Sequence, residues 1–511
     1  MLLSLFVAAA LAAPVAAPAA APAPAGASAP ASAPATILVV PFIVPGEDAQ
    51  WAGVAAAEIV LDVVVQSNRD NFLTLKQLDS VLRRLDLHLA DAGVPAGAQK
   101  LAHTLGASDI IVGEIALDGD ALKMTARRLR VSDGATVISA TQEGPKASLP
   151  ILAQRIARTL LGTKGSSGVL TPHVQALELA TRCELEMARF SLGPRTRSAL
   201  PAERVASAEK HCSAALAIDP LFGLAKAGLA MVRAAQGKFS EARKQAEDAR
   251  EDQGKARFLP LAVLTEAYAA ARMGDDADAR TLLEEAMEER PGFLHALGYL
   301  GEERLEAHDD ADALKAFEQY LKRVPNHPWA MGRKAHAMAR LGHRNEAIDL
   351  SEEALKLNPG DPELLIETAS RYIDAGRDAK AEPLLKQARD ATPPRPLASL
   401  RLGYLYFRGH KQKEAREELG RALELAHRED ETKIRALAHA DLARLDARQA
   451  NFEGAIEELT KARKEGLVKL PCDEPELARW KARPELANLC SEIALAGTDP
   501  KADDTVPIDF E

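Results

Sequence analysis

The 34 residues from Pro328 to Asp361 read PWAMGRKAHAMARLGHRNEAIDLSEEALKLNPGD, and their pattern recurs on both sides of this segment. Residues of one kind recur every 34 positions in four sets. Prolines stand at Pro291, Pro325, Pro359 and Pro393, and alanines at Ala279, Ala313, Ala347, Ala381 and Ala415. A second alanine set, interrupted by Tyr320, comprises Ala286, Ala354, Ala388 and Ala422; a glycine set, interrupted by His308 and His410, comprises Gly274, Gly342 and Gly376. Such a fixed period indicates a stack of similar structural units.

The first half of the quoted segment predicts a helix. Met331, Ala335 and Met338 recur at helical spacing and mark its packed face. Gly342 follows, and a glycine can take the left-handed conformation that ends a helix because it has no Cβ to clash.

The second half predicts another helix, so that each repeat is a helical hairpin. We expect Asn345 to cap this helix. Ala347 and Ala354 lie seven residues apart, on the face where the two helices touch. Asp361 and Pro362 then suit the cap and first position of the next helix, where no backbone N–H is lost.

The pattern resembles the tetratricopeptide repeat (TPR), whose period is about 34 residues and whose units are helical hairpins. About eight hairpins fit between Thr171 and Gly466, the first with a long loop from Ser191 to Pro201. Breaks in the period place insertions at Asp252–Lys255 and His427–Thr432. The resemblance implies an all-α solenoid, a right-handed superhelix, that binds a protein or peptide segment in its concave groove.

The same resemblance assigns groove positions to the first helix of each hairpin. Carried over by phase, they are Leu264, Tyr268, Arg272, Glu302, Trp329, His336, Arg340, Ile366, Ser370, Leu400, Tyr404 and Arg408. Aromatic and arginine side chains among them are frequent interface hot spots. The alternative is that several of them pack against the next hairpin.

Length and composition fit a multi-domain chain, and the strands and helices predicted below make its fold class α+β. With 511 residues it is too long for one core, and 47% hydrophobic residues suffice to bury several. The aromatic content of only 4% suits close-packed helices. A net charge of -10 argues against nucleic acid as a partner.

The N-terminus predicts export. Residues 1–17 hold an apolar run followed by alanines, as in a secretory signal peptide, although no Lys or Arg precedes the run. The run is too short to span a membrane, and residues 18–35 form an Ala/Pro-rich linker. The alternative is an uncleaved, disordered arm. We therefore expect an exported, periplasmic protein without a transmembrane segment.

Residues 36–162 predict a small α/β domain. Its strands are expected at 37–42, 72–75, 109–117, 121–131 and 136–142, and its helices at 51–65, 76–87, around 101–105 and 148–161. The opening Ile-Leu-Val-Val-Pro-Phe (37–42) and the later Arg-Leu-Arg-Val-Ser-Asp-Gly-Ala-Thr-Val (128–137) resemble the N-terminal domain of TolB and related CsgG- and FlgO-like envelope domains. That resemblance implies envelope localisation and protein association.

The cysteines Cys183, Cys212, Cys472 and Cys490 form no C-x-x-C pair, which argues against a zinc or redox motif. In an exported chain they allow three pairings, of which we favour Cys183–Cys212 within the first hairpin and Cys472–Cys490 within the C-terminal segment. Free thiols in a reducing cytoplasm are the alternative.

The remaining segments carry no recognised chemistry. The Gly/Ser linker 163–170 lacks the ending of a phosphate-binding loop. Residues 467–497 resemble the helical cap that closes TPR arrays, and 498–511 form an acidic tail expected to be disordered. The histidines lack metal-site spacing, and no catalytic motif occurs, so we predict no cofactor, no metal and no enzymatic activity.

The leading functional hypothesis is an interaction scaffold of the cell envelope. One alternative is an envelope assembly component that oligomerises through the α/β domain, with a homo-oligomer as one possible form. The other is an enzyme or nucleotide-binding α/β domain that the repeats recruit to a partner.

Overall fold

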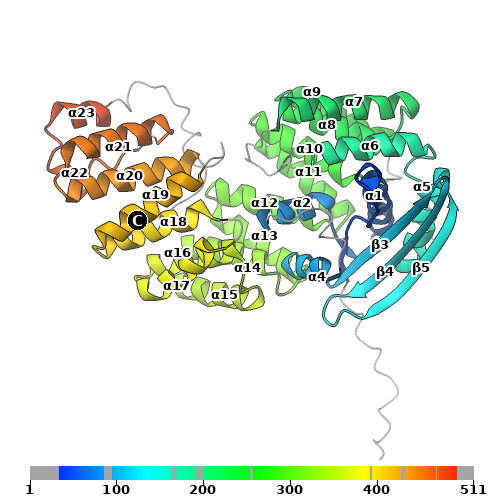
Figure 1. Cartoon of the computed structure of the whole chain (residues 1–511), viewed down its shortest axis with the longest axis horizontal. Coiled ribbons are helices and arrows are strands. Elements are labelled where there is room, and N and C mark those ends of the chain that lie inside the picture. The colour runs from blue at the N-terminus through cyan, green and yellow to red at the C-terminus, as the bar shows by residue number, and fades with distance from the viewer. Residues whose placement is uncertain are drawn as a thin grey trace, which may run out of the picture. The chain divides into compact units, whose positions relative to one another are not determined.

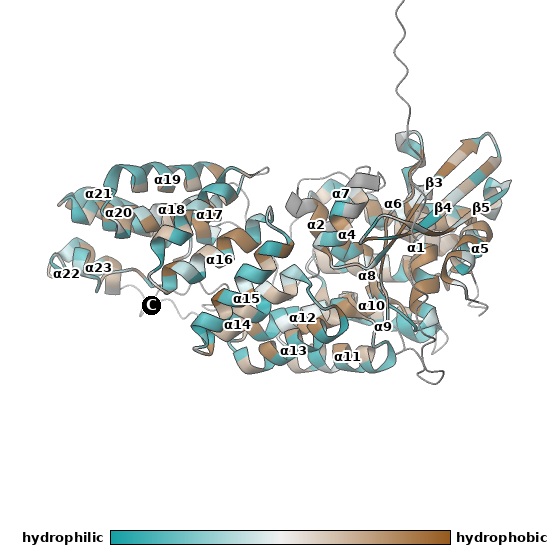
Figure 2. Cartoon of the chain, turned by 90° about the horizontal axis from the view of Figure 1, so that it is seen from below, coloured by the Kyte–Doolittle hydropathy of each residue, from teal (hydrophilic) through white to brown (hydrophobic). Residues whose placement is uncertain are grey.

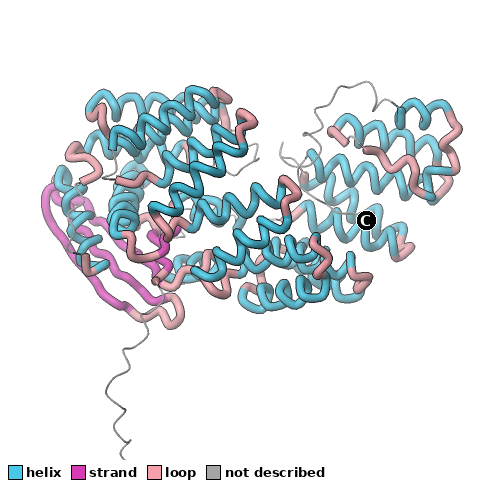
Figure 3. The backbone as a smooth tube through the Cα atoms, turned by 180° about the vertical axis from the view of Figure 1, so that it is seen from behind, coloured by secondary structure: helices cyan, strands magenta, loops and turns pink. Residues whose placement is uncertain are grey.

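The computed structural model describes residues 34–491 except 86–94, 164–168, 189, 191, 193–199, 254–256, 392–393, 427–431 and 468. The expected signal peptide, most of the Ala/Pro-rich linker, most of the loop 191–201 and the acidic tail lie outside the described residues. Parts of both insertions do as well. Strands gather near the N-terminus of the described chain, and helices follow (Figure 1; Figure 3, strands in magenta).

The N-terminal region contains a five-stranded sheet in the order β2-β1-β3-β4-β5. The strands are β1 (Thr36–Val39), β2 (Asn71–Leu73), β3 (Asp109–Asp118), β4 (Ala121–Arg130) and β5 (Thr136–Pro145). The short strand β1 pairs in parallel with β2 and β3, and every side chain of β1 is buried. The strands β3, β4 and β5 are antiparallel hairpins. The continuous apolar run at the start of the domain is therefore explained by its central place in the sheet.

Helices accompany this sheet: α1 (Gln50–Ser67), α2 (Leu75–Leu85), α4 (Pro95–Thr104) and α5 (Leu149–Leu161), with short 3₁₀ turns η1 (Glu47–Ala49) and η2 (Lys146–Ser148). Helix α5 packs on β4 and β5 and against α1. On β4 the side chains alternate, with Leu122, Met124 and Ala126 buried and their neighbours facing out. Such alternation is typical of a strand with one face in the core and one face in solvent.

Eight helical hairpins follow in the described residues. They pair α6 (Val174–Glu186) with α7 (Ala202–Ile218), α8 (Gly223–Ala235) with α9 (Phe239–Gln253), α10 (Pro260–Arg272) with α11 (Asp276–Glu289), α12 (Leu294–Glu306) with α13 (Asp310–Arg323), α14 (Pro328–Arg340) with α15 (Arg344–Leu357), α16 (Pro362–Asp374) with α17 (Asp378–Arg389), α18 (Pro396–Arg408) with α19 (Gln412–Leu425), and α20 (Thr432–Arg448) with α21 (Phe452–Lys464). Each hairpin contacts the next, as the period predicts.

The turn inside each hairpin from α8 to α21 contains a left-handed residue. Gly274, Gly342 and Gly376 all have positive φ, between 68° and 92°. His308 and His410 occupy the same column and adopt φ 57° without the help of glycine. The repeat therefore imposes this conformation even where the side chain disfavours it.

The helix starts agree in part with expectation. Asp361 caps α16, because its side chain accepts from the backbone N–H groups of Glu363 and Leu364. The prediction for Asn345 was wrong: α15 has already begun at Arg344, and the Asn345 side chain instead accepts a 3.0 Å hydrogen bond from Arg377 of the next hairpin.

Both favoured cysteine pairs lie at disulfide geometry. Cys183 of α6 and Cys212 of α7 have Cα atoms 5.5 Å apart, so this bridge joins the helices of the first hairpin. Cys472 and Cys490 have Cα atoms 6.3 Å apart. They link the start of the C-terminal segment to α23 (Pro484–Ser491), which follows the short α22 (Pro475–Ala478). Both end units are thus cross-linked.

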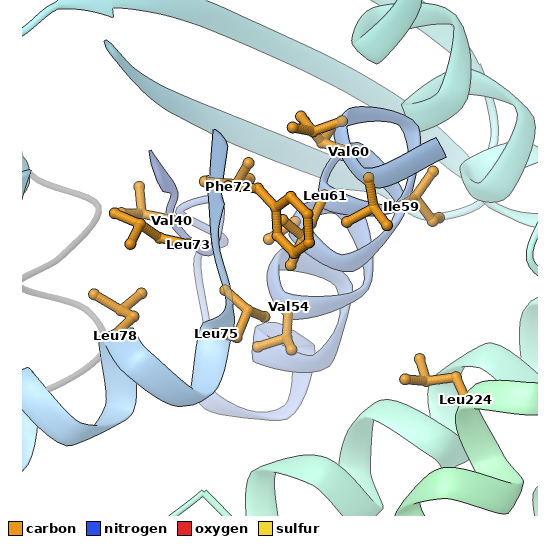
Figure 4. Close-up of a cluster of buried hydrophobic side chains, with 14 of the residues drawn as sticks. Val40, Val54, Ile59, Val60, Leu61, Phe72, Leu73, Leu75, Leu78 and Leu224 are labelled. Carbon is orange, nitrogen blue, oxygen red and sulfur yellow. The ribbon is translucent and has the colours of Figure 1, made fainter. Parts of the chain in front are cut away.

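The sheet region packs directly on the repeats. The Phe72 ring of β2 stacks on Phe293, with centroids 5.5 Å apart, and its backbone N–H donates to the Gly292 carbonyl. Thr74 hydrogen-bonds His295 of α12 at 2.8 Å. In Figure 4, Leu224 of α8 lies on the repeat side of the cluster formed by side chains of α1, β2 and α2. One continuous apolar core therefore spans the sheet and the first hairpins.

Candidate interaction face

The first helices of the last four hairpins present one continuous face. Helix α14 contacts α16, α16 contacts α18, and α18 contacts α20. Equivalent positions in these helices are 34 residues apart, or 40 across the insertion before α20. We call the set of polar side chains at these positions the first-helix face; it comprises Arg333, His336, Arg340, Glu367, Ser370, Asp374, Arg401, Tyr404, Arg408, Asp441, Arg444 and Arg448.

Opposite charges alternate along one column of this face, through Arg333, Glu367, Arg401 and Asp441. The guanidinium group of Arg333 lies 2.8 Å from Glu302 of α12 and 2.9 Å from Glu367 of α16. Burial alone would lower the pKa of Arg333, but the two carboxylates raise it overall. This arginine therefore stays charged and links three successive hairpins.

The charges of nearby arginines act on His336. Burial, together with Arg371, Arg333, Arg340 and Arg401, lowers the pKa of His336 to about 2. The imidazole is therefore neutral at ordinary pH, and it offers one donor and one acceptor without adding charge. Arg371 is held in place because it donates to the Gly332 carbonyl at 2.8 Å.

At its C-terminal end the face is completed by acidic residues that follow the last repeat. Arg444 forms hydrogen bonds of 2.5 and 2.6 Å with Glu474, and it also pairs with Asp441. Arg448 lies 2.6 Å from Glu476 and stacks over the Phe407 ring, 3.7 Å from its centroid. The segment after the repeats thus supplies carboxylates to arginines of the face.

Seven of the twelve groove residues predicted from the sequence are not part of this face, and the leucine and isoleucine side chains among them (Leu264, Ile366 and Leu400) are buried. Tyr268 is only 3% exposed and meets Phe190 and Phe239 edge to face. The guanidinium group of Arg272 lies over the Phe239 ring. Glu302 pairs with Arg333, as described above.

The predicted residues of α14 also make internal contacts. Trp329 is partly buried against Phe317, Tyr320 and His327. Arg340 pairs with Asp310 at 3.0 Å and donates to the Leu305 carbonyl.

The remaining predicted residues lie together near α16 and α18. The Ser370 hydroxyl donates to the Ile366 carbonyl one turn earlier. Arg408 lies 6.0 Å from the Tyr404 ring centroid and donates to the Ile373 carbonyl at 3.2 Å. With 37% of its side chain exposed, Arg408 is the most accessible arginine of the face for which an ion pair is resolved.

Sequence reasoning missed the buried charges of the face. Arg371, Arg401 and Asp441 are all less than 10% exposed. A signal existed, because Arg333, Glu367 and Arg401 follow one another at intervals of 34 residues. A comparison of charged residues, as well as small ones, at intervals of 34 positions would have revealed this column of alternating charges.

The face also differs in charge from the rest of its hairpins. The four first helices α14, α16, α18 and α20 carry ten lysines and arginines against five aspartates and glutamates, a formal charge of +5. Their second helices α15, α17, α19 and α21 carry eleven against thirteen, a formal charge of -2. Helices α19 and α21 are largely hydrophilic (Figure 2, teal). Within these four hairpins the excess positive charge therefore lies on the first helices, although the net charge of the chain is -10.

A second group of buried charges lies between α1 and the repeats. Burial and the neighbouring carboxylate of Glu184 raise the pKa of Glu58, and burial raises the pKa of Asp62 to about 6 although Arg257 opposes it. Both carboxyl groups line a small cavity of about 50 Å³ that Lys76 also borders. These groups join the sheet region to α6 and to the loop before α10.

Among the described residues, no helix is long and apolar enough to cross a membrane. Nor do the described histidine, cysteine and acidic side chains form a group of three or more that could hold a metal ion.

Comparison with known proteins supports the repeats. Two family models, both described as tetratricopeptide repeat, match residues 264–328, 304–365 and 340–401. The helical array is a TPR solenoid of many hairpins. No curated protein sequence matches this chain.

Several solved structures are similar to it. A tetratricopeptide repeat protein from Parabacteroides merdae is 18% identical, with a TM-score of 0.39, over 46% of this chain and 93% of its own. PilW, a widely conserved type IV pilus biogenesis factor, is 17% identical, with a TM-score of 0.35, over 42% of this chain and 94% of its own. A thermophilic TPR protein from Thermus thermophilus is 24% identical, with a TM-score of 0.32, over 36% of this chain and 99% of its own.

Proposed function

We propose that this TPR protein is a non-enzymatic scaffold that binds an extended segment of another protein along the first-helix face. TPR proteins generally mediate protein–protein interactions. The observation that carries the proposal is the continuous, arginine-rich row of polar side chains on α14, α16, α18 and α20, whose formal charge is +3 on helices that together carry +5. Such side chains hydrogen-bond a bound backbone and carboxylates, and arginine and tyrosine are frequent hot spots.

The sheet region supports placing the binding segment on the later repeats. Contacts from β2, α1 and α2 already cover residues of α8, α10 and α12, among them Leu224, Leu264 and His295. On the later repeats, by contrast, Arg408 of α18 has 37% of its side chain exposed. A partner would therefore meet Arg408 and Tyr404 more readily than Tyr268.

A peptide-display selection against the full chain tests this proposal. Selected peptides should bind the wild-type chain and lose about 5- to 30-fold in affinity on Arg408→Glu, as expected for a hot spot worth about 1–2 kcal/mol. Arg421→Glu is the matched control, because Arg421 lies on the second helix α19 with 52% of its side chain exposed. Peptides that bind the Arg408→Glu and wild-type chains equally would overturn the proposal.

We also propose that the protein acts in the cell envelope. Its two cysteine pairs at disulfide geometry suit an oxidising compartment, because disulfides persist there and are rare in the cytosol. The expected signal peptide and the resemblance of residues 36–162 to TolB- and CsgG-like domains agree with this location. Cell fractionation combined with thiol alkylation tests it: free thiols in a cytoplasmic fraction would refute the placement.

A second candidate function is self-assembly through the sheet region. Strand β5 is ten residues long and pairs only with β4 among the described strands, so its other edge offers unpaired backbone groups. Light scattering of the purified chain separates the two candidates. A stable oligomer that a proline at Thr141 dissociates would favour assembly, whereas a monomer would exclude it.

A further inference from the structure

We propose that the acidic C-terminal segment, residues 492–511, binds back onto the first-helix face and competes with a partner for it. This inference rests on the function proposed above, because it assigns an internal competitor to the same face. Residues 492–511 lie outside the described part of the chain, so the argument comes from the face, from where α23 ends and from the charge of the segment.

Charge complementarity is the first argument. Residues 492–511 contain six aspartates and glutamates and one lysine, a formal charge of -5. The first helices α14, α16, α18 and α20 carry +5, while their second helices carry -2. The segment is therefore attracted to the first helices and repelled by the second helices.

The second argument is that the chain already uses carboxylates from beyond its last repeat as partners for the face. Glu474 hydrogen-bonds Arg444 at 2.5 Å, and Glu476 lies 2.6 Å from Arg448. These contacts satisfy the arginines of α20. Arg408, on the preceding first helix α18, donates to the Ile373 carbonyl, but its ion pair with Asp378 is longer, at 3.6 Å, and its side chain is more exposed. It is the next arginine that a following acidic segment would meet.

The third argument is reach. The described chain ends at Ser491 in α23, which contacts α21 of the last hairpin, and the Leu489 carbonyl accepts a hydrogen bond from Arg463 there. Twenty extended residues span up to about 65–70 Å. Neighbouring packed helices lie about 8–10 Å apart, so α14 to α20 covers about 30 Å. The segment is long enough to follow the whole face.

Tethering makes even weak binding effective. A segment joined by a short linker experiences a local concentration of about 1 mM. If the free peptide binds with a Kd of about 100 μM, the tethered segment occupies the face about nine-tenths of the time. A competitor then binds about tenfold more weakly than it would to the open face.

The test uses a fluorescent peptide of residues 492–511 and fluorescence polarisation. The receptor is the full-length chain in two forms: wild type, and a variant with a neutralised tail that carries Asp499→Asn, Asp503→Asn, Asp504→Asn and Asp509→Asn. We expect the peptide to bind the neutralised-tail chain about tenfold more tightly than the wild-type chain. Its binding should weaken as salt rises, since screening shortens the range of the attraction.

Variants on top of the neutralised tail locate the site. Arg408→Glu should weaken peptide binding severalfold, whereas Arg421→Glu on α19 should leave it unchanged. Equal binding to the wild-type and neutralised-tail chains, or no binding to the neutralised-tail chain, would overturn the inference. An effect of Arg421→Glu as large as that of Arg408→Glu would also overturn it, because attraction would then not depend on the face.

This experiment also separates the two proposals. If display-selected peptides bind the face but the tail peptide does not, only the internal competitor is refuted. If neither kind of peptide depends on Arg408, the proposed function fails as well.

Discussion

Helix α18, which carries part of the first-helix face, packs closely against α19 at Gly403. A substitution of Gly403 tests this close contact. A Cβ atom at this position would lie 2.6 Å from Leu419 Cγ, 2.7 Å from its Cδ2 and 3.3 Å from its backbone nitrogen. Leu419 of α19 is fully buried, so its side chain has no free space to move into. Gly403→Ala therefore forces α18 and α19 apart.

A second glycine in the same hairpin provides the matched control. Gly420 lies in α19, and an added Cβ there would meet nothing within 4 Å. Both substitutions gain about 1 kcal/mol of helix propensity, but only Gly403→Ala also costs about 1–3 kcal/mol of overpacking. Gly420→Ala should be the more stable variant by that 1–3 kcal/mol, because the propensity gain cancels in the comparison.

Thermal melting followed by circular dichroism measures the difference, with hydrogen exchange of the α18–α19 hairpin as a local readout. At about 2–4 °C per kcal/mol, the melting temperature of Gly403→Ala should lie about 2–12 °C below that of Gly420→Ala. Equal melting temperatures and equal exchange for the two variants would refute the helix packing described here.

Three further predictions concern the disulfide of the first hairpin, a buried carboxyl group and the contact between β2 and the repeats. Replacing Cys183 and Cys212 by serine should lower the stability of the first hairpin by about 3 kcal/mol, because the bridge closes a 29-residue separation; unchanged denaturant midpoints would contradict this. Burial raises the pKa of Asp62 to about 6, because the folded state disfavours the ionised carboxylate. The stabilisation of the folded state that comes with the protonated carboxyl group is therefore fully present below about pH 4, and it is lost as the pH rises through 6. Stability should therefore fall between about pH 4 and 7, and Asp62→Asn should flatten that fall; an identical pH profile would contradict the assignment. Phe72→Ala removes a ring stacked 5.5 Å from Phe293 and should cost about 3–5 kcal/mol, seen as faster proteolysis of the sheet region; unchanged proteolysis would show that this contact is dispensable.

Much of the array could be predicted because each unit contacts mainly its neighbours in sequence. The alanine columns through Ala347 and Ala354 mark buried helix contacts, and both residues are fully buried. The glycine column located the left-handed turns, and even the exceptions His308 and His410 adopt that conformation. A strict period records such local geometry directly.

Other features could not be predicted because they depend on residues distant in sequence. Nothing near Phe72 indicates that its partner is Phe293, since neither residue breaks a local pattern. Phase alone could not tell which first-helix positions are buried, so Tyr268 and Arg408 were assigned alike although one is buried and the other exposed. Asn345 lies just inside α15 rather than at its cap, and this small offset is enough to turn its side chain toward the neighbouring hairpin.

The pairing of β2 with residue 293 sets an order of events during synthesis. About 220 residues separate Leu73 from Phe293, so a ribosome adding 5–20 residues per second needs about 10–45 s to deliver the partner of β2. Until then the outer edge of β2 and the Phe72 ring stay open to other chains. A newborn molecule is thus most exposed to misassembly through its earliest segment, and a holding chaperone would be of most use during that interval.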